Sequence, residues 1–198
     1  MTDDHSIRIA LLTIAGIVFP IGLYHRIQSQ ATRERLDRRQ EGWFILLTLR
    51  PVALVMAIGI IGYLVDSAYM TWSSIDLPMA LRWTGVGLCA FGGGLLLWAF
   101  RSLGKNLTDT VVTRREHSLV TGGPYRFVRH PFYDSVALFI GGIAIAAANW
   151  FILAAGSVVI GLLVLRTRIE EEKLLARFGD PYRAYVAGTG RFLPKLRA

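Results

Sequence analysis

Long apolar stretches alternate with polar, charged stretches along this chain. Four apolar runs are evident, at residues 7–24, 43–65, 79–100 and 132–165. Each of the first three approaches the ~20 residues that a helix needs to cross a hydrocarbon core about 30 Å thick. The fourth run is too long for one crossing, and Asn149 interrupts it. It therefore predicts two shorter helices joined in a tight hairpin, which makes about five spanning helices in all.

The apolar runs are predicted to be helices rather than barrel strands. A backbone in lipid must satisfy its own hydrogen bonds, which leaves only helices or a closed barrel. The runs lack the alternation of apolar and polar residues that barrel strands show. Composition agrees, since 53% of the 198 residues are hydrophobic and 18% are charged, whereas soluble domains carry about 25% charge. The predicted fold class is an all-α, polytopic integral membrane protein.

Basic residues are distributed asymmetrically around these runs, and the formal net charge is +8. Lys and Arg concentrate in residues 25–41, in residues 101–131 and in the tail from Arg166, and they are absent from residues 66–78 and from the Asn149 turn. Cytoplasmic loops carry such an excess of bases, which predicts an N-terminus outside and a C-terminus in the cytoplasm. Because the bases border apolar blocks, anionic lipids are favoured over nucleic acid as their partner. Residues 25–41 are predicted to form a helix on those headgroups.

Other features exclude several classes of protein. The single cysteine, Cys89, lies within an apolar run and cannot form an internal disulfide. The four histidines and this cysteine show no clustered ligand spacing, so no metal site is predicted. The acidic start of the chain is unlike a cleavable signal peptide. The glycines of residues 91–94 are typical of close helix packing.

Two polar regions of unusual composition flank the predicted hairpin, at residues 105–134 and 166–194. Because the two far ends of a hairpin lie side by side, we expect these regions to meet. The sequence therefore divides at residue 104 into three spanning helices with a basic loop at residues 25–41, and a catalytic region over residues 105–198. The catalytic region comprises a polar loop, the hairpin at residues 132–165 and C-terminal helices.

The first polar region combines a turn with aromatic and titratable side chains. Gly122-Gly123-Pro124 is a turn signal that lets backbone approach a ligand. Pro131 suits the first turn of the following helix, which puts His130 and Tyr133 on similar faces. Such a loop suits an aromatic, partly charged ligand such as a nucleoside. Equally, it suits an interfacial loop with anchoring tyrosines and arginines.

The second polar region predicts a charged helix followed by another helix. Arg166 and Glu170 are four residues apart and can pair on one helix face. The pair is consistent with a solvated, salt-bridged helix, or with an arginine that binds a substrate carboxylate. Gly179 is a helix stop, and Pro181 is suited to the first turn of the next helix. Tyr182 and Tyr185 then share a face, where packing is the commoner role.

The stretches HSLVTGGPYRFVRHPFY (residues 117–133) and RTRIEEEKLLARFGDPYRAYVAGTGRFLP (residues 166–194) resemble the isoprenylcysteine carboxyl methyltransferase family of membrane enzymes. The resemblance covers about residues 105–194. It implies S-adenosylmethionine as methyl donor and O-methylation of the carboxylate of a prenylcysteine-like lipophilic substrate that enters from the bilayer. The active site would lie on the cytoplasmic side.

The resemblance also implies site residues. Arg166 aligns with the arginine that faces the substrate carboxylate, and Glu170 and Glu171 align with the family's paired glutamates. The cofactor pocket would be lined by His117, Leu119, Val120, Gly123, Tyr125, His130, Tyr133 and Glu171. Helical spacing joins Arg166 to Glu170, whereas the resemblance points more to Glu171 as its companion, and both remain candidates.

Three alternatives to this function remain open at this point. In the first, the methyl acceptor is a phospholipid amine or a small thiol, for which Arg166 would have no anion to hold. In the second, the chain is a membrane reductase of the sterol-reductase type that binds NADPH. In the third, it is a non-catalytic membrane scaffold, which would bind neither nucleotide.

Overall fold

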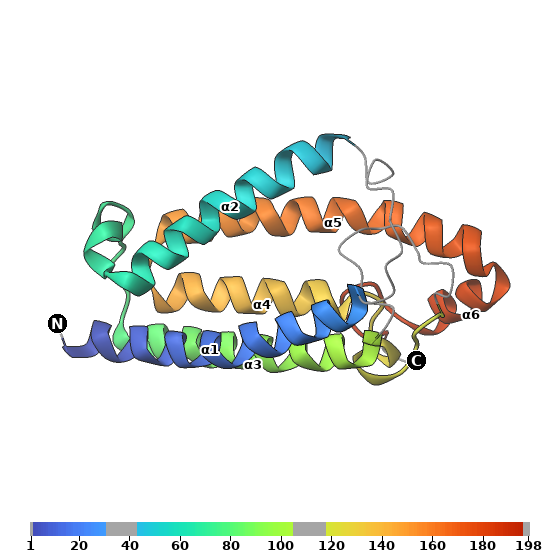
Figure 1. Cartoon of the computed structure of the whole chain (residues 1–198), viewed down its shortest axis with the longest axis horizontal. Helices are drawn as coiled ribbons and strands as arrows, with labels where there is room; N and C mark the ends of the chain where they lie inside the picture. The colour runs from blue at the N-terminus through green and yellow to red at the C-terminus, as the bar shows by residue number, and fades with distance from the viewer. Residues whose placement is uncertain (1, 31–42, 105–117, 196–198) are drawn as a thin grey trace.

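The computed structural model describes residues 2–30, 43–104 and 118–195. Within these residues the chain is helical and has no strand. Six α-helices and two 3-10 helices follow one another: α1 (Thr2–Gln30), α2 (Trp43–Val65), η2 (Ser67–Ser73), α3 (Met79–Leu103), η4 (Gly123–Arg126), α4 (Pro131–Ala146), α5 (Trp150–Phe178) and α6 (Asp180–Gly188). Figure 1 shows α1, α3, α4 and α5 lying roughly side by side along the long axis, α2 inclined to them, and α6 at one end.

The predicted membrane-spanning class is confirmed by the lengths and surfaces of the helices. Within the described residues, four are long and apolar enough to cross a membrane, at Asp4–Gln28, Leu47–Val65, Met79–Leu103 and Trp150–Phe178, and the apolar α4 is shorter. Large apolar side chains face outward on these helices, among them Phe19, Leu47 and Phe91, each more than 60% exposed. Soluble proteins rarely expose such extended apolar surface, so these faces suit lipid.

The tightest packing in the bundle joins α3 to α4, and small residues make it possible. A Cβ built on Gly85 would lie 2.5 Å from the backbone nitrogen of Ala146, and one on Gly92 would lie 2.6 Å from that of Phe139. A Cβ on Gly142 would run into the backbone of Cys89. Close packing at residues 91–94 was predicted, and Gly92 confirms it, because helices in lipid associate through close contact between backbones.

The predicted hairpin between α4 and α5 turns at Asn149. The buried side chain of Asn149 accepts a hydrogen bond from the Ile152 nitrogen at 3.0 Å, which caps α5. Its Nδ2 donates to the Ser73 Oγ at 2.8 Å and to the Met70 carbonyl at 3.2 Å, both in η2. One side chain thus caps a helix and joins η2 to the turn. The apolar hairpin was predicted to end at residue 165, and α5 continues from it without a break through the charged region to Phe178, before the predicted stop at Gly179.

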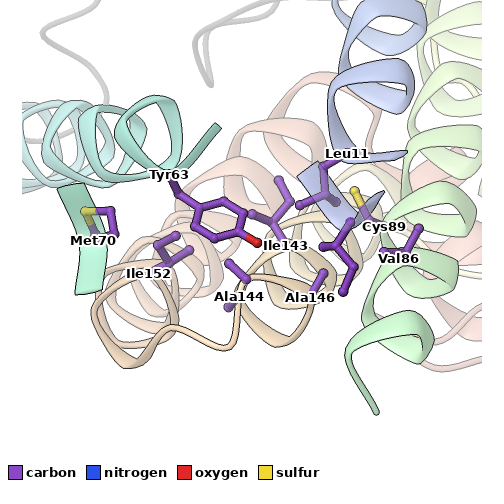
Figure 2. Packing of buried hydrophobic residues seen from close by; sticks show 11 residues of the cluster. Leu11, Tyr63, Met70, Val86, Cys89, Ile143, Ala144, Ala146 and Ile152 are labelled. Atoms are coloured by element: carbon purple, nitrogen blue, oxygen red, sulfur yellow. The ribbon is translucent and has the colours of Figure 1, made fainter. Parts of the chain in front are cut away.

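We call the end of the bundle with this turn, η2 and the N-terminus the hairpin end. Buried apolar residues gather near it, including Ile7 and Leu11 of α1, Tyr63 of α2, Cys89 of α3 and Ile152 of α5. Figure 2 shows the Tyr63 ring reaching from α2 towards Ile143. This cluster therefore holds all five long elements together at one end.

We call the opposite end the site end. There α1 and α3 finish, and α2 and α4 begin. The polar half of α5 and the short α6 also lie at this end (Figure 1). The helix order thus brings residues before α4 beside residues near the end of α5. The division of the chain after residue 104 stays a prediction.

Candidate active site

The site is built where α4 begins and where α5 turns polar. Pro131 occupies the first turn of α4, where its missing N–H costs nothing. His130 is the residue immediately before that turn and is buried. Across from it, α5 presents Glu170 and Glu171. The expected convergence of the two polar regions is observed, since the His130 Nε2 lies 3.1 Å from the Glu171 Oε1.

Glu171 is the centre of this arrangement. Its Oε1 accepts a hydrogen bond from the Arg129 Nε at 2.9 Å, as well as facing His130. Arg191 completes the set, with its Nε 3.2 Å from the Oε1 and its Nη2 donating to the Oε2. Ion pairs between guanidinium and carboxylate are among the strongest protein hydrogen bonds. Glu171 therefore links three segments that are far apart in the sequence.

Glu170, its neighbour on α5, makes a different set of contacts. Its Oε2 accepts a hydrogen bond from the Tyr133 hydroxyl at 2.8 Å and lies 3.9 Å from the His130 Nδ1. The Tyr133 and His130 rings are stacked, with centroids 5.5 Å apart and planes 12° apart. The centroid of the Phe192 ring lies 5.7 Å from that of the imidazole. His130 thus sits among aromatic rings, with a carboxylate near each of its two nitrogens.

The C-terminal segment, residues 189–192, lies along the residues that precede α4. The Arg129 nitrogen donates to the Gly190 carbonyl at 2.9 Å, and the His130 nitrogen donates to the Arg191 carbonyl at 3.1 Å. The Arg129 Nη1 also donates to the Thr189 carbonyl at 2.5 Å. These bonds give partners to backbone groups that lie outside the helices and therefore have no helical hydrogen bond. The approach to α4 is thus held in place by the end of the chain.

Helix α6 fixes the loop before it through Tyr185. The Tyr185 hydroxyl donates to the Tyr125 carbonyl at 2.6 Å. Burial raises the pKa of Tyr185 to about 12, so the hydroxyl keeps its proton at physiological pH. The hydrogen bond with Glu171 raises the pKa of Arg191, which likewise remains charged. Both groups are therefore permanent donors.

The structure places the remaining predicted residues unevenly around this centre. Tyr125 is buried in η4, and its phenol lies within electrostatic reach of Glu170. Leu119 and Val120 are half-buried in the coil before η4. Arg166 is half-buried one turn before Glu170 on α5, and its charge acts on the Tyr133 phenol. His117 lies outside the described residues.

Gly123 also has a local role in the packing of η4. Its φ is +61°, in the left-handed region that glycine tolerates best. A Cβ at this position would run into the Ser102 side chain at the end of α3. Gly123 therefore lets η4 close onto α3, whereas a Cβ on Gly122 would meet nothing within 4 Å.

Two arginines of the site were missed by the sequence analysis. Arg129 and Arg191 both bind Glu171, but they are 62 residues apart and neither has a carboxylate at helical spacing. The sequence signal was that Arg129 precedes His130 and Pro131, that Arg191 lies between Gly190 and Phe192, and that both arginines fall inside the two stretches that carry the family resemblance. Among the described residues, no group of three His, Cys, Asp or Glu side chains is placed to hold a metal ion.

Comparisons with known proteins show which sequences this chain is similar to. A model of the isoprenylcysteine carboxyl methyltransferase (ICMT) family matches residues 85–177. The chain is 26% identical over 189 residues to the protein-S-isoprenylcysteine O-methyltransferase of Schizosaccharomyces pombe, covering 87% of this chain and 80% of that protein. It is 27% identical over 180 residues to the cobalt-zinc-cadmium resistance protein CzcN of Cupriavidus metallidurans, covering 89% of this chain and 71% of that protein.

A solved structure has the same fold. The eukaryotic intramembrane Ras methyltransferase ICMT matches with a TM-score of 0.57 at 22% identity, covering 93% of this chain and 67% of that one. The family resemblance predicted from two stretches is therefore confirmed: the matched region contains all of residues 117–133 and residues 166–177 of the second stretch.

Proposed function

We propose that this chain, which is similar to the isoprenylcysteine carboxyl methyltransferases, is an integral membrane methyltransferase that uses S-adenosylmethionine. Its acceptor is the carboxylate of a prenylcysteine-like, lipophilic molecule. The observation that carries this proposal is the meeting of His130 with Glu171 at 3.1 Å. It joins the two polar regions at one end of the membrane helices, within the segment that the family model matches.

The residues present fit an adenosyl sulfonium ligand. The ligand is aromatic at one end and cationic at the other, and the site offers the stacked rings of His130 and Tyr133 together with the carboxylate of Glu170. The Tyr182 hydroxyl is buried and has no hydrogen-bond partner among the described residues. It lies within electrostatic reach of Glu170 and Glu171. A buried hydroxyl without a partner is costly, and a bound polar ligand supplies the missing one.

The predicted residues take the following roles. His117, Leu119, Val120, Gly123, Tyr125, His130, Tyr133 and Glu171 hold the methyl donor, directly or by ordering its loop. When bound, S-adenosylmethionine supplies an electrophilic methyl group. Arg166 binds the acceptor carboxylate through its guanidinium fork. A carboxylate with a pKa near ~4 is already ionised at neutral pH, so the site needs no strong general base.

Alignment of the acceptor is the main contribution of the protein in this reaction. Holding reactants in line can lower a barrier by roughly 7–11 kcal/mol. Glu170 lies one turn beyond Arg166 on α5 and accepts from Tyr133, so it holds the Tyr133 ring beside the arginine. Glu171 is engaged by two arginines. Glu170 is therefore the companion of Arg166, and Glu171 orders the surrounding loop.

The site faces the cytoplasm, and the acceptor enters from the bilayer. Positive charge supports this orientation, because the basic residues 25–41 and 101–131 connect elements at the site end. Exposed apolar side chains at this end, such as Trp98 and Phe127, support lateral entry of a lipid tail. The basic residues also bind anionic headgroups.

Transfer of a labelled methyl group from S-adenosylmethionine to N-acetyl-S-farnesyl-cysteine by the purified protein tests the proposal. We expect a base-labile methyl ester as the product. Parallel reactions with a phospholipid amine and a small thiol test the alternative acceptors. Binding of NADPH in place of S-adenosylmethionine, or of neither, would contradict the proposal in favour of a reductase or a scaffold.

A further inference from the structure

Arg191 lies in the C-terminal segment, far from the two carboxylates in the sequence, yet it contacts Glu171 through two nitrogens. The backbone carbonyl of Arg191 also accepts a hydrogen bond from the backbone nitrogen of His130 at 3.1 Å. Arg191 therefore binds both partners of the contact between His130 and Glu171, the first through its backbone and the second through its side chain. The Glu171 side chain is 15% exposed, so this contact is shielded from water.

The charge at this position determines the state of the imidazole. A carboxylate flanked by two guanidinium groups is ionised and only accepts hydrogen bonds. The His130 Nε2, 3.1 Å from the Glu171 Oε1, must therefore carry the proton and donate it. The Nδ1 is then left facing Glu170 at 3.9 Å. Without a fixed Glu171, either tautomer of His130 is available and the ring can turn.

We propose that Arg191 is a positioning residue for methyl-donor binding: through Glu171 it locks the tautomer and orientation of His130 at the start of α4. This inference rests on the proposed function, since it names what the end of the chain contributes to that site. In this assignment Arg191 acts through Glu171 and His130, which it contacts, and not on a reacting group. It acts because a hydrogen-bonded partner behind a functional histidine fixes its ring, as partners behind metal-bound histidines do.

The first test needs no methyl donor. Imidazole ¹⁵N NMR is recorded on the full chain in detergent micelles, and the His130→Gln variant assigns the His130 signals. We expect the wild-type ring to be protonated on Nε2, and Arg191→Ala to give exchange between tautomers. The matched control is Arg183→Ala, which removes an exposed ion pair with Asp180 on α6 and should leave the His130 signals unchanged. An Nδ1-protonated wild-type ring, or one unaffected by Arg191→Ala, overturns the proposal.

The second test measures affinity by calorimetry with S-adenosylmethionine. Arg191→Ala should weaken binding about tenfold or more, because hydrogen bonds between charged groups are lost. The turnover number at saturating donor should change less than about twofold, as for a residue that acts on binding only. Arg191→Lys should recover part of the affinity. A loss confined to turnover contradicts a positioning role in donor binding.

A double variant separates this device from general destabilisation. Glu171→Gln should weaken binding as Arg191→Ala does, and the two changes together should cost no more than the worse one alone. Additive losses of affinity in the double variant overturn the proposal. If Arg191→Ala does not fold, Arg191→Lys combined with Glu171→Gln replaces it in this comparison. If the wild-type chain binds no S-adenosylmethionine, the proposed function fails, and the NMR comparison still decides the role of Arg191.

Discussion

The two ends of the helix bundle each carry a cluster of charges, and the clusters are built differently. At the hairpin end the Arg82 Nη2 lies 2.6 Å from the Asp4 Oδ1, and the Tyr63 hydroxyl donates to the same oxygen at 3.0 Å. The Arg82 Nε donates to the Ala146 carbonyl at 2.9 Å. One cation thus meets one anion, and the four residues belong to α1, α2, α3 and α4.

At the site end the cluster is neither balanced nor confined to helices. Glu171 faces Arg129, Arg191 and His130, and none of these three lies in an α-helix. Asp4 and Arg82 do line a cavity of about 630 Å³, but their charges are already paired with each other. A balanced cluster between helix ends holds helices together, whereas an excess of donors on irregular segments can reorganise around a ligand.

The largest expected effect comes from Arg166 at the site end. Arg166→Ala should lower methyl transfer about 100-fold or more, because a misplaced acceptor loses that factor readily, while the affinity for S-adenosylmethionine is largely kept. Steady-state kinetics and calorimetry measure the two quantities. Arg168→Ala, two residues further along α5 and exposed, is the control. Loss of donor affinity in Arg166→Ala would contradict its assignment to the acceptor.

The hairpin-end cluster should respond in stability instead of activity. Arg82→Ala leaves Asp4 without its ion pair; removing one partner of a buried pair costs about 3–5 kcal/mol, and we expect a loss at or below the lower end of that range because the Asp4 side chain is 29% exposed. Thermal unfolding in detergent, followed by circular dichroism, measures this loss. Methyl transfer per folded molecule should stay within about twofold of wild type. A specific loss of activity would show that the two ends are coupled and would break the contrast drawn above.

His130 distinguishes the ends through a smaller effect on binding. His130→Ala removes the ring that stacks on Tyr133 and should weaken S-adenosylmethionine about tenfold, since an aromatic pair with one charge-assisted hydrogen bond is lost. The control is His5→Ala, an exposed histidine at the hairpin end. Equal affinities for the two variants would rule out His130 as part of the donor pocket.

The smallest effect is expected at Tyr185. Tyr185→Phe keeps the ring but removes the hydrogen bond to the Tyr125 carbonyl, which is worth about 1 kcal/mol. Hydrogen exchange at η4 should accelerate by about fivefold while the hairpin end is unaffected. Tyr69→Phe, which alters an exposed tyrosine of η2, is the matched comparison. Unchanged exchange at η4 would mean that α6 does not hold the loop.

Local features of the fold were predictable from sequence because their causes are local. The apolar run at residues 43–65 coincides with α2, and Asn149 and Gly179 act as the expected cap and stop. The ends of α1 were missed by several residues, since it runs from Thr2 to Gln30 and not over residues 7–24. A helix continues through polar residues when nothing breaks it, and apolar periodicity marks only its lipid-facing part.

The candidate site was predictable only in part. The two motifs implied that His130 and Glu171 would be neighbours, and helical spacing drew attention to Arg166 and Glu170. Neither approach pointed to Arg191, because its contact with Glu171 depends on how α6 and the residues after it return to the start of α4. Tertiary ion pairs of this kind leave no periodic trace in a sequence. The predicted helix over residues 25–41 lies largely outside the described residues and stays a prediction.

The continuity of α5 from Trp150 to Phe178 has a consequence for how such a chain can vary. The lipid-facing half of α5 and the acidic pair belong to one continuous helix. A single residue inserted between them would rotate Glu170 and Glu171 about the helix axis by about 100° and shift them along it by about 1.5 Å. The length of the membrane-spanning part of α5 therefore sets the direction in which the two glutamates point. A lineage that moves to a thicker bilayer must lengthen this helix by whole turns, or lengthen it elsewhere, to keep its acids aimed at the same neighbours.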